Sequence, residues 1–250
     1  QVSALCGSEM GVFRSPGGRA GNPGHEFAGQ IVDTNGHTEF NVGDRVGAHV
    51  IVGCGTCRHC RAGNEIFCPN KLPSGYGHAE RIAVSARHCL RIPDGMDWDT
   101  GVLVSGDGMG VAYHLSRRVG VKAHDTVAVF GCGPVGLGAV SLWSFLGARV
   151  IGVDMSDYRL KLAERLGAWK TVGADGQTVE RLRELTCGAG PDTCLECTGK
   201  PAAVAASFEA ARCGGKVGVV GEQPEATFNP SRDLIHKELS VYGAWYFRVS

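Results

Sequence analysis

One segment near the middle of the chain limits the possible folds more than any other. The strand-like run Thr126–Phe130 leads into the glycine-rich residues 131–136, whose sequence is G-C-G-P-V-G. A helical pattern covers residues 137–146, and a second apolar strand at residues 149–153 ends in Asp154. This order of strand, G-x-G-x-x-G turn, helix, strand and terminal acid is typical of a dinucleotide-binding βαβ unit. It is more specific than the glycine pattern alone.

The glycines and the acid of this unit each have a predicted role. Gly131 would make the tight turn, Gly133 would let the backbone approach the pyrophosphate, and Gly136 would let the helix pack on the strand. Asp154 would bind the adenosine ribose hydroxyls and repel a 2′-phosphate, which favours NAD over NADP. Arg159 is close enough in sequence to contact the ribose or the pyrophosphate, which softens that preference. The cofactor contacts predicted for the turn are Gly131, Gly133, Pro134, Val135 and Gly136.

Four cysteines lie together in one short loop: Cys54, Cys57, Cys60 and Cys68. Such thiols form a disulfide knot, bind one tetrahedral zinc ion together, or remain free. The two-residue gaps favour zinc, because they let successive sulfurs turn toward one point at a Zn–S distance of about 2.3 Å. The remaining cysteines show no pattern typical of secreted disulfide proteins. Since four sulfur ligands leave no open coordination position, we expect this zinc to hold the loop in shape and to do no chemistry.

A second candidate metal site combines residues that are far apart in sequence. They are Cys6 in C-G-S-E, His25 and Glu26 in G-H-E-F-A-G, and Asp107 in S-G-D-G-M-G. One thiolate, one imidazole and one or two carboxylates make a plausible zinc set with room for a water or a substrate oxygen. Each residue alone has a simpler interpretation as a core thiol, a surface turn or a loop residue. The prediction therefore depends on the whole set.

Composition excludes several classes of function. The 25 basic and 25 acidic residues of the 250-residue chain cancel, so no surplus charge indicates binding to nucleic acid or to an anionic membrane. No apolar run is long enough to span a bilayer, and the first residues carry no basic-then-apolar targeting signal. The eleven cysteines, with a zinc-type loop among them, favour a reducing compartment. We therefore expect a cytoplasmic protein.

The organisation of the chain changes near its middle. Before about Pro93, short strands are predicted at residues 30–33, 45–52, 79–84 and 89–92, which suits a small β-barrel. Residues 98–118 are predicted to be helical. Beyond Val121, helices are predicted at residues 157–166, 178–186 and 202–213, and further strands at 193–197, 216–221 and 240–246. The expected fold class is α/β: a β-barrel that carries the metal sites, followed by a doubly wound sheet of six parallel strands.

These motifs, with V-G-D-R-V at residues 42–46 and E-C-T-G at residues 196–199, run along nearly the whole chain in the order of one family. The chain resembles the zinc-containing medium-chain dehydrogenases, the family of alcohol, sorbitol and threonine dehydrogenases. The resemblance implies a GroES-like catalytic domain at residues 1–110 and an NAD-binding Rossmann domain at residues 111–250. It further implies two zinc ions per chain, NAD, a small alcohol or carbonyl substrate, and a homodimer or homotetramer.

The resemblance also assigns roles to single residues. Cys6, His25 and Asp107 would bind the catalytic zinc, and Glu26 matches a residue that is a direct ligand in some members and a neighbour of the ligands in others. Ser8 matches the hydroxyl residue that passes on the substrate proton. Zinc would polarise the alcohol oxygen, and hydride would pass from the carbinol carbon to the nicotinamide. The expected activity is that of an NAD-dependent zinc alcohol or polyol dehydrogenase, of the EC 1.1.1 type.

Two other classes were weighed against this one. A non-catalytic relative would bind a dinucleotide and keep only the structural zinc. A zinc-independent quinone or enoyl reductase would lack both the cysteine loop and His25, so the sequence disfavours it.

The end of the chain carries further expectations from the resemblance. Gly221, Ala244 and Tyr246 match backbone contacts to the nicotinamide, while the side chains of Trp245 and Tyr246 would line the substrate pocket or pack in the core. Relatives carry additional chain at both ends. We therefore expect the first domain to be incomplete at its N-terminus and to lack its C-terminal return. Gly11 stands where polyol and threonine dehydrogenases often place a relay histidine, which leaves the proton path beyond Ser8 open.

Overall fold

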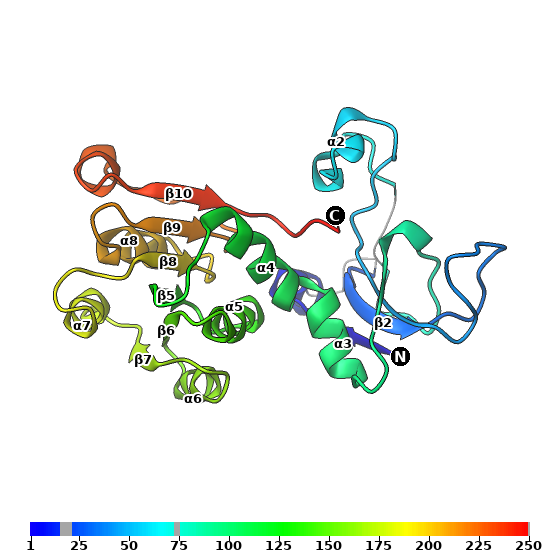
Figure 1. The fold of residues 1–250 in the computed structure, drawn as a ribbon, viewed down its shortest axis with the longest axis horizontal. Coiled ribbons are helices and arrows are strands. Elements are labelled where there is room, and N and C mark those ends of the chain that lie inside the picture. The colour runs from blue at the N-terminus through cyan, green and yellow to red at the C-terminus, as the bar shows by residue number, and fades with distance from the viewer. Residues whose placement is uncertain (16–21, 73–75, 250) are drawn as a thin grey trace. The chain divides into compact units, whose positions relative to one another are not determined.

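The computed structural model describes residues 1–15, 22–72 and 76–249, which form two compact units (Figure 1). The first unit contains Gln1–Gly110 and the residues from Tyr246 onward, and the second contains Val111–Trp245. The predicted second domain covers residues 111–250. In the structure, Tyr246 and Phe247 pack instead in a core cluster of the first unit, together with Phe27 and Val50.

The first unit is built on a four-stranded antiparallel sheet in the order β1-β2-β3-β4. The strands are β1 Val2–Ala4, β2 Glu26–Gln30, β3 Arg45–Ala48 and β4 Cys89–Arg91. The strand predicted at residues 30–33 overlaps β2 only at Gln30; Ile31 still exchanges backbone hydrogen bonds with Gly43 and Asp44, and the chain then turns away. It turns where Asp33 Oδ1 accepts the N–H of Asn35 at 2.8 Å, and Asn35 and Gly36 have positive φ. The strand predicted at residues 79–84 is not formed, and no strand of the described residues pairs with that segment.

Short helices connect the strands of the first unit. They are η1 Gly7–Glu9, α1 Met10–Arg14, α2 Arg58–Arg61, η2 Glu65–Phe67, η3 Ala86–His88 and α3 Trp98–Ser105. Asp97 caps α3 by accepting the backbone N–H of Thr100 at 2.7 Å. The single helix predicted at residues 98–118 is divided, because Gly106 is extended between α3 and α4, which spans Asp107–Val119. The break makes Asp107 the first residue of a helix.

The second unit contains a six-stranded, fully parallel sheet in the order β10-β9-β8-β5-β6-β7, which confirms the predicted six parallel strands. The strands are β5 Thr126–Phe130, β6 Arg149–Asp154, β7 Lys170–Gly173, β8 Thr193–Glu196, β9 Lys216–Val219 and β10 Ser240–Gly243. In sequence order this is the 3-2-1-4-5-6 arrangement of a doubly wound sheet. The strand β7 had no predicted range.

Helices cover both faces of the parallel sheet (Figure 1). They are α5 Pro134–Phe145, α6 Asp157–Arg165, α7 Thr178–Leu185 and α8 Pro201–Ala210, with a π-helical turn η4 Pro230–Ile235. One core cluster contains Trp143 of α5 and Leu115 of α4, and the opposite cluster contains Leu182 of α7 and Phe208 of α8. Covered on both faces, the central strand β5 is buried at every residue. None of the described helices has the length and apolarity needed to cross a membrane.

The order of the strands indicates where the glycine turn after β5 lies in the parallel sheet. β5 lies between β6 and β8, so the connections that follow β5 and β7 run to opposite sides of β5. Doubly wound folds bind ligands at this switch point, outside the carboxyl ends of the strands. Gly131 follows β5 at that edge, and Gly221 lies two residues beyond the end of β9.

Candidate functional site

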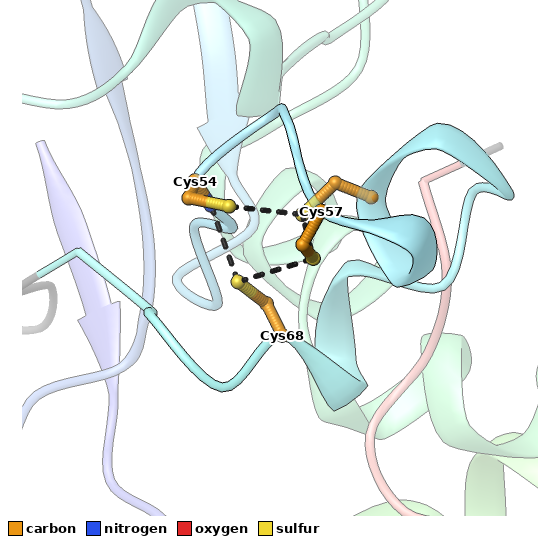
Figure 2. A group of neighbouring side chains, drawn as sticks. Cys54, Cys57 and Cys68 are labelled. Carbon is orange, nitrogen blue, oxygen red and sulfur yellow. Dashed lines mark hydrogen bonds between the residues drawn. The ribbon is translucent and has the colours of Figure 1, made fainter.

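The four predicted structural ligands come together in the cysteine loop. Cys54 and Cys57 precede α2, Cys60 lies within it, and Cys68 follows η2. Figure 2 shows the sulfurs of Cys54, Cys57 and Cys68 facing one another. The Sγ–Sγ distance is 3.5 Å from Cys57 to Cys60, 3.8 Å from Cys57 to Cys68 and 4.0 Å from Cys54 to Cys60. A tetrahedron with Zn–S bonds of about 2.3 Å has edges of about 3.8 Å. A disulfide would need about 2.05 Å, so the spacing favours a metal over a disulfide.

The charge state of these thiols supports the same interpretation. Hydrogen bonds from Thr56 lower the pKa of Cys54 to about 6, whereas desolvation raises the pKa of Cys60 to about 12. Four thiols at this spacing cannot all ionise unless a cation offsets their repulsion. The loop itself is fixed by Glu65, whose Oε2 accepts the N–H of Gly53 at 3.3 Å. The sequence did not indicate this role of Glu65.

The four residues of the second predicted metal set also lie together, although they come from three separate parts of the sequence. Cys6 follows β1, His25 and Glu26 lie at the start of β2, and Asp107 begins α4. One potential ligand atom of each residue lies within 4.8 Å of those of the other three. His25 Nε2 is 3.6 Å from Asp107 Oδ2.

The orientation of His25 suits a metal ligand. Its Nδ1 lies 3.1 Å from the backbone oxygen of Pro23 and 3.0 Å from Glu9 Oε1. Both neighbours are acceptors, so a proton on Nδ1 is satisfied there, and Nε2 is the ring nitrogen left to bind a metal on the side of Asp107. A histidine that binds a metal is held in this way by an acceptor behind the ring.

The ionisable groups of this cluster shift one another's pKa values. A hydrogen bond with Asp107 is the main cause that raises the pKa of His25 to about 11, and a hydrogen bond with His25 lowers the pKa of Cys6. Burial raises the pKa of Glu26. Asp107 Oδ1 is buried and has no hydrogen-bond partner among the described residues. A bound cation would supply the partner that this oxygen lacks, so the residues present fit a metal ion.

Glu26 and Ser8 lie at the edge of the cluster. Glu26 is buried, and its Oε1 accepts the backbone N–H of Asp107 at 3.1 Å. It is therefore placed both to bind a metal and to fix Asp107. Ser8 is exposed in η1, and hydrogen bonds from Ser8 contribute to the lowered pKa of Cys6.

Sequence reasoning missed one acid of this site. Glu9 is only 2% exposed, and its Oε2 accepts the backbone N–H of Cys6 at 2.8 Å. The available signal was its place three residues after Cys6, at the N3 position of η1, from which an acidic side chain reaches back to the N-cap backbone. A third contact of Glu9, with His78, had no signal in the sequence.

The glycine turn of the second unit has the shape of a phosphate cradle. Gly131 has φ of +93°, and a Cβ on Gly136 would lie 1.8 Å from the oxygen of Gly131, so both positions need glycine. A Cβ on Gly133 would meet no atom within 4 Å, which leaves open space beside the backbone there. Pro134 and Val135 begin α5, whose first turn faces this space with free N–H groups.

The predicted ribose acid is held in place by the same turn. Asp154 is 7% exposed; its Oδ2 accepts the N–H of Cys132 at 2.8 Å, and its Oδ1 accepts the N–H of Ser156 at 2.9 Å. Arg159 Nη1 lies 3.7 Å from Asp154 Oδ2. These bonds fix the carboxylate at the end of β6, beside the glycine turn.

The three residues predicted to contact the nicotinamide lie in different places. Gly221 packs against the turn after β8, where a Cβ would lie 2.2 Å from the N of Gly199. The N–H of Ala244, just after β10, is donated to the oxygen of Val219 at 3.3 Å. Tyr246 belongs to the first unit, and its side chain packs in a core cluster there.

Two family profiles match the chain. Residues 1–94 match the profile described as "Alcohol dehydrogenase GroES-like domain", and residues 134–250 match "Zinc-binding dehydrogenase". An uncharacterised zinc-type alcohol dehydrogenase-like protein of Escherichia coli (strain K12) is 33% identical over 264 residues. An L-threonine 3-dehydrogenase of Bacillus velezensis is 33% identical over 258 residues. Each alignment covers 97% of this chain and 74% of the relative.

A solved structure shows the same likeness over nearly the whole chain. The crystal structure of galactitol-1-phosphate dehydrogenase from Escherichia coli is 26% identical, with a TM-score of 0.87. The match covers 98% of this chain and 74% of that one. The chain thus spans about three quarters of the length of these relatives.

Proposed function

This chain belongs to the zinc-containing medium-chain dehydrogenase family, and from that assignment we propose that it transfers a hydride between an alcohol or polyol and NAD. The family and the fold class, a GroES-like domain with a parallel-sheet Rossmann domain, agree with the sequence prediction. One observation carries the proposal. Cys6, His25, Glu26 and Asp107 form a donor set of their own, apart from the four cysteines.

Each residue of this set has a proposed role. Cys6, His25 and Asp107 would hold the catalytic zinc, and Glu26 would bind it directly or fix Asp107 through the backbone hydrogen bond at 3.1 Å. When bound there, zinc supplies Lewis acidity that lowers the pKa of an alcohol hydroxyl. Unlike the loop of four cysteines, a set with one sulfur suits a site that exchanges a water for a substrate oxygen.

Ser8 would take the substrate proton. It lies two residues after Cys6, and hydrogen bonding from Ser8 helps to lower the pKa of the Cys6 thiol. Because Ser8 is exposed, a proton that reaches its hydroxyl can pass directly to water. This path does not need the histidine that Gly11 replaces.

The second unit would bind NAD, which accepts the hydride. The pyrophosphate would lie on the N–H groups at the start of α5, in the open space beside Gly133. Asp154 would accept hydrogen bonds from the adenosine ribose hydroxyls. Its carboxylate is already fixed by the N–H groups of Cys132 and Ser156, so it would repel a 2′-phosphate without moving.

The relatives narrow the substrates that are worth testing. Two of them are named for L-threonine and for galactitol 1-phosphate, both of which are alcohols with further polar groups. We infer a substrate with a secondary hydroxyl, taken from simple alcohols, polyols, polyol phosphates and hydroxy amino acids. The non-catalytic alternative is less well supported, because the full donor set of the catalytic metal is present.

Zinc content and turnover together test this proposal. Protein purified without added metal should contain two zinc ions per chain by elemental analysis, one for each donor set. Cys6→Ala and Cys57→Ala should each lose one zinc ion. Cys6→Ala should abolish alcohol-dependent formation of NADH while it leaves the fold intact. A chain with a single zinc ion, lost only in Cys57→Ala, and no turnover with any alcohol of the panel would establish the non-catalytic alternative.

A further inference from the structure

His78 lies outside both donor sets, yet its ring contacts the acid that supports the catalytic cluster. Its Nε2 is 3.3 Å from Glu9 Oε2, and its Nδ1 is 2.9 Å from the hydroxyl of Ser3. A serine hydroxyl can donate to Nδ1, which leaves the ring proton on Nε2 to be donated to the carboxylate. The hydrogen bonds therefore run in one direction, from Ser3 through His78 to Glu9.

Glu9 connects this chain of hydrogen bonds to the metal set. Its carboxylate accepts the backbone N–H of Cys6 and lies 3.0 Å from His25 Nδ1. It thus touches two of the predicted zinc ligands. The carboxylate is almost completely buried, and its Oε2 is shared by the N–H of Cys6 at 2.8 Å and by His78 Nε2 at 3.3 Å. His78 thus holds Oε2, the oxygen that also accepts the N–H of Cys6, while His25 lies beside Oε1.

The segment that carries His78 is fastened to the turn that carries His25. Asn22 Nδ2 donates to the oxygens of Tyr76 and His78, at 3.1 Å and 2.7 Å. Asn22 Oδ1 accepts the N–H groups of Gly24 and His78, each at 3.1 Å. A Cβ on Gly24 would lie 2.5 Å from the N of His78, so the two segments are in close contact at the residue before His25.

We propose that His78 is a positioning residue for the catalytic zinc, which acts through Glu9 on Cys6 and His25. The inference rests on the proposed function, because it assumes a metal ion in the Cys6 set. Partners behind metal ligands typically change metal affinity about 10–100-fold when they are removed. His78 should therefore slow the loss of the catalytic zinc and have no effect on the zinc of the cysteine loop.

The test is the rate of zinc release from the full purified chain to a coloured chelator, with elemental analysis of the zinc that remains. His78→Phe keeps a ring of similar size but removes both hydrogen bonds, and it should release the catalytic zinc about tenfold faster or more. His78→Gln can still donate to Glu9 and should release zinc at a rate closer to that of the original protein. His37→Phe, at an exposed histidine, is the matched control and should change nothing.

A double-mutant cycle separates an action through Glu9 from an independent one. If His78 acts through Glu9, then His78→Phe should have little further effect in a chain that already carries Glu9→Gln. Multiplicative effects of the two changes would overturn the proposal. So would a folded His78→Phe variant that releases the catalytic zinc at the original rate.

Two further outcomes are decisive. If His78→Phe does not fold, Ser3→Ala replaces it, since loss of the bond to Nδ1 should also speed release; an unchanged rate would overturn the inference. An original protein with zinc only in the cysteine loop would overturn the proposed function and this inference together. Two zinc ions with no effect at His78 would overturn this inference alone.

Discussion

Glu26 Oε1 accepts the backbone N–H of Asp107 at 3.1 Å, which joins the start of β2 to the first residue of α4. The two carboxylates meet because the helical segment breaks at Gly106, which is extended between α3 and α4. Without this break, Asp107 would be an interior residue of a continuous helix. The break therefore does more than end α3: it places a predicted metal ligand.

Gly106→Ala should disturb this arrangement. A Cβ at this position would lie 2.8 Å from the oxygen of Val102 and 3.3 Å from the Cβ of Glu26. Overpacking of this kind typically costs about 1–3 kcal/mol, so we expect a loss of that size in the free energy of unfolding, together with a lower catalytic zinc content. Urea unfolding and elemental analysis would measure both. Gly108→Ala, whose Cβ would meet nothing closer than 3.4 Å, should have little effect on either.

Cys57→Ala should destabilise the fold far more than Cys6→Ala. The Cys57 sulfur lies 3.5 Å and 3.8 Å from two other thiols, and the structural metal they would share ties the loop together. Loss of a structural metal is one of the few causes of large destabilisation, so we expect the free energy of unfolding to fall by about 4 kcal/mol or more. Denaturant unfolding with and without a chelator measures it. Cys187→Ala, at an exposed thiol, is the control; an equal loss there would refute a special role for the loop.

The local patterns of the second unit could be predicted from the sequence alone. The strand β5, Thr126–Phe130, has the predicted bounds, because an apolar run that stops at a glycine turn is specified by adjacent residues. The short strands of the first unit depend more on pairing with segments that are distant in sequence. β2 was placed too late, because its first residue, Glu26, was interpreted as a candidate metal ligand and not as the start of a strand. Segment 79–84 has strand-forming residues but no partner strand in the described structure.

The candidate site was predictable only in part, for a similar reason. Cysteine, histidine and carboxylate residues can be recognised as ligands by type, and the structure brings Cys6, His25, Glu26 and Asp107 together. The contact between Glu9 and His78 joins segments that are 69 residues apart in sequence. Neither residue type nor spacing marks such a contact. The residues that support a site are therefore harder to find in a sequence than the ligands themselves.

Asp154→Ala should weaken NAD binding and relax the discrimination against NADP. The carboxylate would make charged hydrogen bonds to the ribose, and such bonds contribute about 1.5–3 kcal/mol. This corresponds to a rise in the dissociation constant of NADH of roughly 10–150-fold, with a smaller change for NADPH. Titration calorimetry with both cofactors measures it. Asp157→Ala, at an exposed acid in the first turn of α6, should leave both constants unchanged. An unaltered affinity in Asp154→Ala would place the ribose elsewhere.

Asp192 should contribute stability to the second unit that is lost in acid. Burial alone would raise its pKa, but hydrogen bonds from the Thr126 N–H and Arg212 Nε, each at 2.7 Å, outweigh burial and lower the pKa. A pKa below the unfolded value of about 3.9 means that the carboxylate stabilises the fold above about pH 4. That contribution disappears as the pH falls through the lowered folded pKa.

Asp192→Asn should therefore lower the free energy of unfolding near neutrality, and its difference from the original protein should shrink in acid. Urea unfolding between about pH 6 and pH 2 measures this difference. Arg212→Gln, which removes one of the two donors, should show part of the same effect; a difference that stays constant with pH would show that Asp192 stabilises the fold without its charge.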